Sequence, residues 1–136
     1  RGSEMAIELE IVLRLLLAAV AGAIIGFQRE RAGKSAGLRT HSLICLGAAL
    51  FTVASVFGFV GAEPARIAAG IVTGIGFLGA GAIIRREEGV VGGLTTAATI
   101  WAVAGVGLVA GAGMYLVAAV ATAIVLAVLL IPRIVG

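Results

Sequence analysis

The sequence has little of what soluble enzymes and metal proteins use. Of its 136 residues only 12% are charged, and it holds one cysteine, one histidine and two prolines. A single cysteine excludes a disulfide within the chain, and one cysteine with one histidine cannot build a zinc cage from one chain. Soluble domains are about a quarter charged, so this chain has too few charges to cover an ordinary water-exposed surface.

What the chain has instead is apolar residues, at 61% of the total, and a mean hydropathy of +1.19. This composition predicts an integral membrane protein. We take residues 1–4 as a cloning remnant ahead of Met5, and residues 5–136 as a single transmembrane domain. No basic stretch with a small-residue cleavage site precedes the first apolar run, so we expect that run to be a retained span.

Five apolar segments are long enough to cross a hydrocarbon core of about 30 Å as helices. Backbone groups find no water in lipid, which favours helices, and the segments lack the alternation of barrel strands. The predicted fold is an all-α, five-helix transmembrane bundle with spans at 11–27, 43–60, 67–84, 94–110 and 114–131. Pro64 is expected at the start of the third helix, and the GAG turn at 111–113 predicts a tight hairpin of the last two helices.

Lysine and arginine collect in alternate loops, which the positive-inside rule assigns to the cytoplasm. The first loop carries four of them, the third carries Arg85 and Arg86, and Arg133 follows the fifth span, whereas the second loop has only Arg66. The first and third loops and the C-terminus are therefore predicted to be cytoplasmic, with the N-terminus outside. The formal charge of +3 follows this orientation, so we expect no nucleic-acid partner.

Glycines recur at spacings that suit two different roles. Residues 74–79 contain G-x-G-x-x-G, the spacing of a dinucleotide-binding loop, but no strand or soluble βαβ unit surrounds it, and a nucleotide site is rejected. Glycines four apart form smooth stripes by which helices pack in lipid. We assign that role to Gly22, Gly26, Gly70, Gly74, Gly76 and Gly79. A locally broken helix lining a polar cavity is the alternative.

Arg14 is the one charge that the first span carries into the membrane. Glu10 lies one helical turn before it and is available as an ion-pair partner. Arg14 either snorkels outward to the membrane interface, or it is a buried anchor for another helix or for a polar pathway.

A polar cluster is predicted at the cytoplasmic edge from Arg29, Glu30, Arg39, Thr40 and His41. Cations at the end of the first helix complement its dipole, whereas Arg39 and His41 open the second helix and need a compensating anion. We expect Glu30 to pair with Arg39, and Thr40 or Ser42 to cap the second helix. The loop either only signals topology or forms a specific polar site.

Threonines and the lone thiol are the remaining candidates for chemistry. Thr95, Thr96 and Thr99 open the fourth helix, where they bond preceding carbonyls or a neighbouring helix, or line a polar groove. His41 and Cys45 share a helix face, as a nucleophile and its base would, but the sequence places no carboxylate to orient them. We therefore expect no enzyme activity and no cofactor or metal bound by one chain.

Three stretches together resemble the MgtC/SapB family of bacterial membrane proteins. They are LRLLLAAVAGAIIGFQRERAGKSAGLRTHSLICLGAALF, EPARIAAGIVTGIGFLGAGAII and GLTTAATIW. Gln28 stands where the family often has the first acid of G-x-E-R-E. The resemblance implies a multi-pass protein of the bacterial plasma membrane, linked to growth at low magnesium, acid tolerance and survival in host macrophages, and thus to virulence. It also implies, for some members, contact with membrane machinery such as the F-type ATP synthase.

Two functions of different class remain. The first is a regulatory membrane protein that acts through helix–helix contacts, as a homodimer or with another membrane protein. The second is a transporter or channel for a small cation such as Mg²⁺, or for another solute, lined by Glu30, Arg39 and the threonines. The scarcity of intramembrane carboxylates favours the first, because Mg²⁺ sites are built from oxygen ligands.

Overall fold

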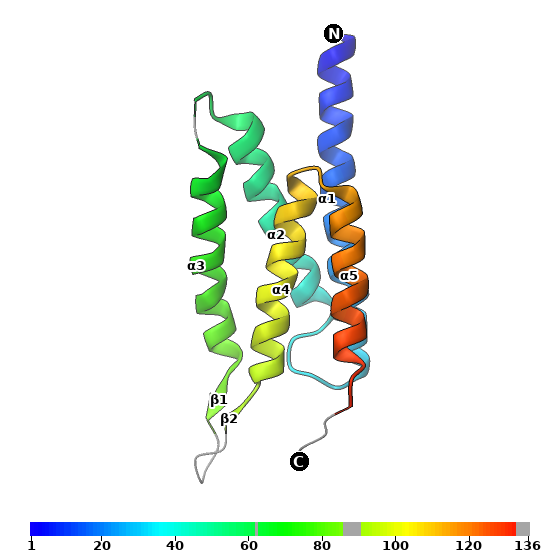
Figure 1. Ribbon diagram of the computed structural model, residues 1–136, viewed down its shortest axis with the longest axis vertical. Coiled ribbons are helices and arrows are strands. Elements are labelled where there is room, and N and C mark those ends of the chain that lie inside the picture. The colour runs from blue at the N-terminus through cyan, green and yellow to red at the C-terminus, as the bar shows by residue number, and fades with distance from the viewer. Residues whose placement is uncertain (62, 86–90, 133–136) are drawn as a thin grey trace.

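The computed structural model describes residues 1–61, 63–85 and 91–132, and its five helices lie side by side in an elongated bundle (Figure 1). They are α1 (Gly2–Arg31), α2 (Leu38–Val53), α3 (Pro64–Ala82), α4 (Leu94–Gly111) and α5 (Tyr115–Leu129). A π-helical segment, η1 (Ala54–Gly58), continues α2. Two short strands, β1 (Ile84–Arg85) and β2 (Val91–Gly92), pair antiparallel ahead of α4. The prediction of an all-α chain with five helices is confirmed, and the two-residue strands were not foreseen.

In the described part of the chain, four helical segments are long and apolar enough to cross a membrane. They are Gly2–Arg31, Leu38–Gly58, Pro64–Ala82 and Leu94–Gly111. The fifth helix, α5, is apolar but has only 15 residues, which is about 22 Å at 1.5 Å per residue. It is therefore shorter than the predicted 114–131, although it lies alongside α4 in the bundle (Figure 1).

The turns follow the prolines and glycines of the sequence. Pro64 stands in the first turn of α3, as predicted. Gly113 has φ +83° in the tight turn from α4 to α5, where its amide donates to the Ala110 carbonyl oxygen at 3.0 Å. Gly93 has φ +86° directly before α4, and a Cβ there would collide with the Ala82 carbonyl oxygen. Both positions need glycine, because a side chain strains a left-handed backbone.

Several helix boundaries differ from the predicted spans. α1 begins at Gly2 rather than at residue 11, and its first turns project beyond the other helices (Figure 1). α2 begins at Leu38, well before residue 43, and neither Thr40 nor Ser42 caps it. The α3 helix ends at Ala82, because Ile84 pairs with Gly92 in the β-hairpin.

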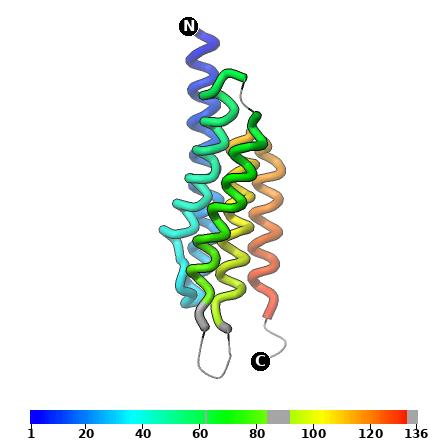
Figure 2. Tube along the Cα trace, turned by 90° about the vertical axis from the view of Figure 1, so that its left-hand side faces the viewer, coloured from blue at the N-terminus to red at the C-terminus, as the bar shows by residue number. Residues whose placement is uncertain are grey.

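α4 is the central helix and contacts each of the other four. The core around it consists largely of small side chains, so the helices approach closely. Its buried members include Ala18, Ala21, Ile25, Ala49, Val103 and Ala110. α3 packs mainly on α4; it lies at the left edge of the bundle in Figure 1 and therefore faces the viewer in Figure 2. Only Ile75 and Gly79 of this helix are buried. Most of the α3 surface is therefore available to lipid or to another protein.

Candidate functional site

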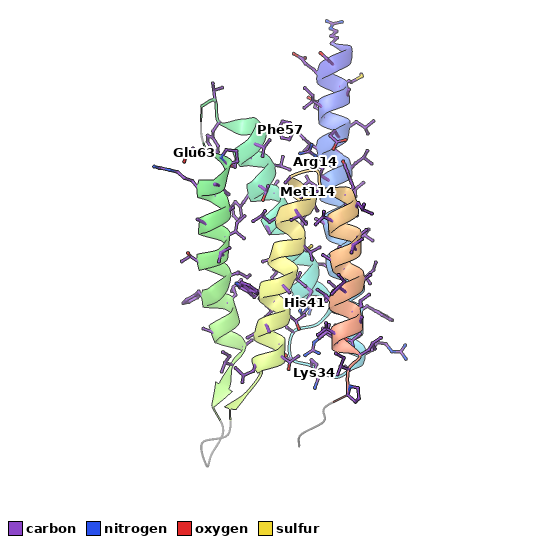
Figure 3. The ribbon with its side chains drawn as sticks, viewed as in Figure 1. Arg14, Lys34, His41, Phe57, Glu63 and Met114 are labelled. Carbon is purple, nitrogen blue, oxygen red and sulfur yellow. The ribbon has the colours of Figure 1, made fainter. Side chains whose placement is uncertain are left out.

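The two ends of the bundle differ in charge. Lys34, in the basic loop, lies at one end and Glu63, before α3, lies at the other (Figure 3). The β-hairpin shares the Lys34 end (Figure 1). Of the residues used to predict orientation, Arg86 and Arg133 lie outside the described residues.

Arg29 is the buried charge at the Lys34 end. It stands in the last turn of α1 with 3% of its surface exposed. Its Nη2 donates a hydrogen bond to Thr96 Oγ1 in the first turn of α4, at 3.1 Å. Its Nε is buried and has no hydrogen-bond partner in the described part of the chain. Arg29 thus ties α1 to α4 while part of its guanidinium stays unsatisfied.

His41 is fully buried in the first turn of α2. Its Nδ1 lies 2.9 Å from the Gly37 carbonyl oxygen. Because a carbonyl oxygen only accepts, Nδ1 carries the hydrogen in this contact. Nε2 is then the free ring nitrogen, and it is buried with no partner among the described atoms.

Cys45 lies one turn after His41 and is also fully buried. It packs against Gly22 of α1 and Gly107 of α4, and a Cβ added at either glycine would collide with Cys45. Among the described side chains, no three His, Cys, Asp or Glu residues come together as a metal site. The geometry gives Cys45 a packing role between three helices.

The expected ion pair between Glu30 and Arg39 is contradicted: between described residues the only ion pair joins Glu10 and Arg14. Glu30 Oε1 instead accepts the Leu38 amide at 3.3 Å. That amide opens α2 and has no helical carbonyl to bond, so the carboxylate satisfies it. Of the predicted polar cluster, Arg29 and His41 are interior, whereas Glu30, Arg39 and Thr40 are exposed.

The threonines of α4 lie in different surroundings. Thr99 is buried and donates to the Thr95 carbonyl oxygen of its own helix at 2.7 Å. Thr96 is buried against α1, where it accepts the hydrogen bond from Arg29. Thr95 is exposed. Two of the three hydroxyl groups are therefore committed to contacts within the bundle.

Arg14 anchors several segments near the Glu63 end (Figure 3). Its Nε donates to Glu10 Oε2 at 2.8 Å, which confirms the expected pair, and its Nη1 donates to the Gly111 carbonyl oxygen at 3.0 Å. The guanidinium lies 5.0 Å from the ring centroid of Phe57 in η1, a cation–π contact. Tyr115 donates to the same Glu10 oxygen. The structure thus favours an anchor between helices over a snorkelling arginine.

The predicted packing glycines fall into three groups. Gly22 and Gly26 are buried where α1 meets α2, and an added Cβ would lie 2.5 Å and 2.8 Å from backbone oxygens there. A Cβ at Gly79 would make ordinary contact with Ala97 at 3.6 Å. A Cβ would meet nothing within 4 Å at Gly70, Gly74 and Gly76. Close packing at these last three glycines would need a second chain, so it stays a prediction.

An apolar groove of about 510 Å³ opens between α2 and α3, and we call it the α2–α3 groove. Gly47 of α2 faces Gly70 and Gly74 of α3 across this groove, and a Cβ at any of the three would meet nothing within 4 Å. Leu43 and Leu78 also line the groove, and both are largely exposed. The sequence did not single out this groove, because it depends on how far α2 and α3 stand apart.

The α2–α3 groove ends at a polar pocket near η1. Arg66 and Ile67 line both the groove and this pocket, which has a volume of about 440 Å³. Ser55 and Glu63 complete its polar lining, and the Ser55 hydroxyl donates to the Pro64 carbonyl oxygen at 3.5 Å. π-Helical segments often mark functional sites, but no sequence pattern had pointed to η1.

Residues 15–135 match the MgtC family. The chain is 53% identical over 114 residues to the Escherichia coli K12 protein named "Putative magnesium transporter YhiD", covering 78% of this chain and 53% of that protein. It is 51% identical over 107 residues to MgtC of Brucella abortus, covering 79% and 44%. It is 49% identical over 115 residues to MgtC of Salmonella typhimurium, covering 85% and 49%. The chain thus spans about half the length of these relatives. No solved structure matches it.

Proposed function

Because the chain belongs to the MgtC family, we propose that it is a regulatory protein of the bacterial plasma membrane that acts by binding other membrane proteins. The role we assign to it is adaptation to low magnesium, to acid stress or to survival in a host. The observation that carries the proposal is the α2–α3 groove, which is apolar and has glycines on both of its walls where an added Cβ would meet nothing within 4 Å.

The groove suits a transmembrane helix of a partner protein. The hydrophobic effect does not drive two apolar helices together in lipid, so their association depends on close packing along small residues. Gly47, Gly70 and Gly74 offer such a surface. Arg66, at the polar end of the groove, can pair with an acidic residue near the end of the incoming helix. We propose the F-type ATP synthase as the first partner to test. When no partner is bound, we propose that the protein is a homodimer.

We further propose that five spans place the N-terminus outside and the C-terminus in the cytoplasm. The exposed basic residues Arg31, Lys34 and Arg39 support this orientation, because cytoplasmic loops are rich in lysine and arginine. The odd number of helices also puts the start of α1 and the end of α5 at opposite ends of the bundle (Figure 1).

Magnesium transport is the second candidate, and the name of the Escherichia coli relative favours it. Against it, the two carboxylates that flank the first predicted span have other bonds: Glu10 binds Arg14 and Tyr115, and Glu30 binds the Leu38 amide. A Mg²⁺ path needs free oxygen ligands or a wide polar pore. Mg²⁺ uptake into liposomes loaded with the protein, abolished by Glu30→Ala, would establish transport instead.

Site-specific photocrosslinking in native membranes tests the groove directly. A photoreactive amino acid replaces Leu43, which lines the groove and is 68% exposed, and in a matched control it replaces Leu116 of α5, which is 77% exposed. We expect the probe at position 43 to capture a discrete membrane protein and the control to react with lipid. Equal protein capture at the two positions, or none at either, would contradict the proposal.

A further inference from the structure

One cation is buried with no counter-charge among the described residues. Arg29 is 3% exposed, and no described carboxylate lies within ion-pair distance of it. A buried charge that lacks a partner is strongly destabilising. Glu30 is adjacent in sequence, but its carboxylate binds the Leu38 amide. Along residues 28–41 four arginines and lysines stand against this one acid.

The position of Arg29 next to a helix N-terminus makes its buried charge still more unfavourable. Its Nη2 binds Thr96, which lies in the first turn of α4. The N-terminus of a helix carries a partial positive charge and unbonded amide groups, so it attracts anions and repels cations. α4 has no acidic residue in its first turn and no side-chain cap. Two positive groups therefore meet here, and an anion between them would stabilise both.

The guanidinium of Arg29 keeps an unused donor that suits an oxyanion. Arg29 Nε, a donor, is buried without a partner in the described chain, although Nη2 beside it is used. The guanidinium fork can hold two oxygens of a phosphate at once. His41 Nε2 and Gln28 Oε1 are also buried without described partners. Both are acceptors, so a hydroxyl group of the ligand would satisfy them.

We propose that Arg29, with the first turn of α4, binds the phosphate of an anionic ligand at the Lys34 end of the bundle. The phosphate belongs either to the headgroup of a phospholipid or to free inorganic phosphate. Helix N-termini bind phosphate through the same amide groups and dipole. This site is separate from the α2–α3 groove, and the inference does not depend on a partner helix binding there.

The test compares phosphate sources by the thermal unfolding of delipidated protein in detergent. One arm adds inorganic phosphate, with chloride at equal ionic strength as its control. The other adds phosphatidylglycerol, with a galactolipid of the same chains, which has no phosphate, as its control. Arg29→Gln is the test variant. Arg31→Gln is the matched control, because Arg31 is an exposed cation in the same helical turn.

We expect saturable stabilisation of the wild-type protein and of Arg31→Gln in one arm, and at least tenfold weaker binding by Arg29→Gln. The arm that responds identifies the source of the phosphate. If Arg29→Gln does not fold, Thr96→Val takes its place, since it keeps the charge but loses the contact that positions it. No specific stabilisation of the wild-type protein in either arm overturns the proposal. An equal loss of ligand-induced stabilisation in Arg29→Gln and Arg31→Gln also overturns it, because binding would then reflect surface charge alone.

Discussion

A glycine in this bundle is either enclosed by a neighbouring helix or open to the surroundings, and the two cases predict opposite effects of one added methyl group. Gly22→Ala would place Cβ 2.5 Å from the His41 carbonyl oxygen. Helices α1 and α2 would then have to separate, and overpacking of this kind costs about 1–3 kcal/mol. We expect a lower unfolding midpoint in detergent.

Gly74→Ala is the matched control, because its Cβ would point into open space. Its stability should equal or slightly exceed that of the wild-type protein, since alanine favours the helix more than glycine does. If Gly22→Ala unfolds at the wild-type midpoint, the close packing of α1 on α2 is incorrect. The spacing of glycines in the sequence could not separate these two classes, because it does not say which helix faces are covered.

At the scale of one element, α2 depends on a residue of the preceding helix for its start. Glu30→Ala should destabilise the protein by about 1 kcal/mol, as the loss of a helix cap does, because the Leu38 amide loses its acceptor. Arg39→Ala should have almost no effect, since Arg39 is exposed. Unfolding measurements on both variants and on the double variant should give additive changes. Strong coupling between the two substitutions would instead indicate an ion pair between Glu30 and Arg39, contrary to the structure.

Elements differ in how much of them the sequence could predict. Hydropathy located all five helices, because each is a long apolar run. The apolar span 43–60 left out the first turn of α2, although Arg39 and His41 were expected to open this helix. That His41 is buried was not predicted. Within the polar cluster, the bond of Glu30 to the Leu38 amide was not foreseen. The sequence could not predict that Thr96 is the partner of Arg29, because the two residues are far apart in the chain. The α2–α3 groove likewise depends on how two helices lie relative to each other.

For the whole molecule, the proposed topology makes a simple prediction. Reporter fusions at Lys34 should report the cytoplasm and fusions at Glu63 the outside, because these residues lie at opposite ends of the bundle (Figure 3). Arginine and lysine in the first loop set this orientation. Reports from the same side at both positions would show that α2 does not cross the membrane.

The central claim is that the protein works by association through the α2–α3 groove, and the size of its complex in native membranes tests this most directly. Membranes are extracted without detergent, and the particle mass is measured for the wild-type protein, for Gly74→Leu and for Ala119→Leu. Leucine at position 74 fills the groove, whereas position 119 is an exposed site on α5. We predict that the wild-type protein and Ala119→Leu occur in particles larger than one chain, and that Gly74→Leu occurs as a single chain. Identical particle masses for all three would contradict the account.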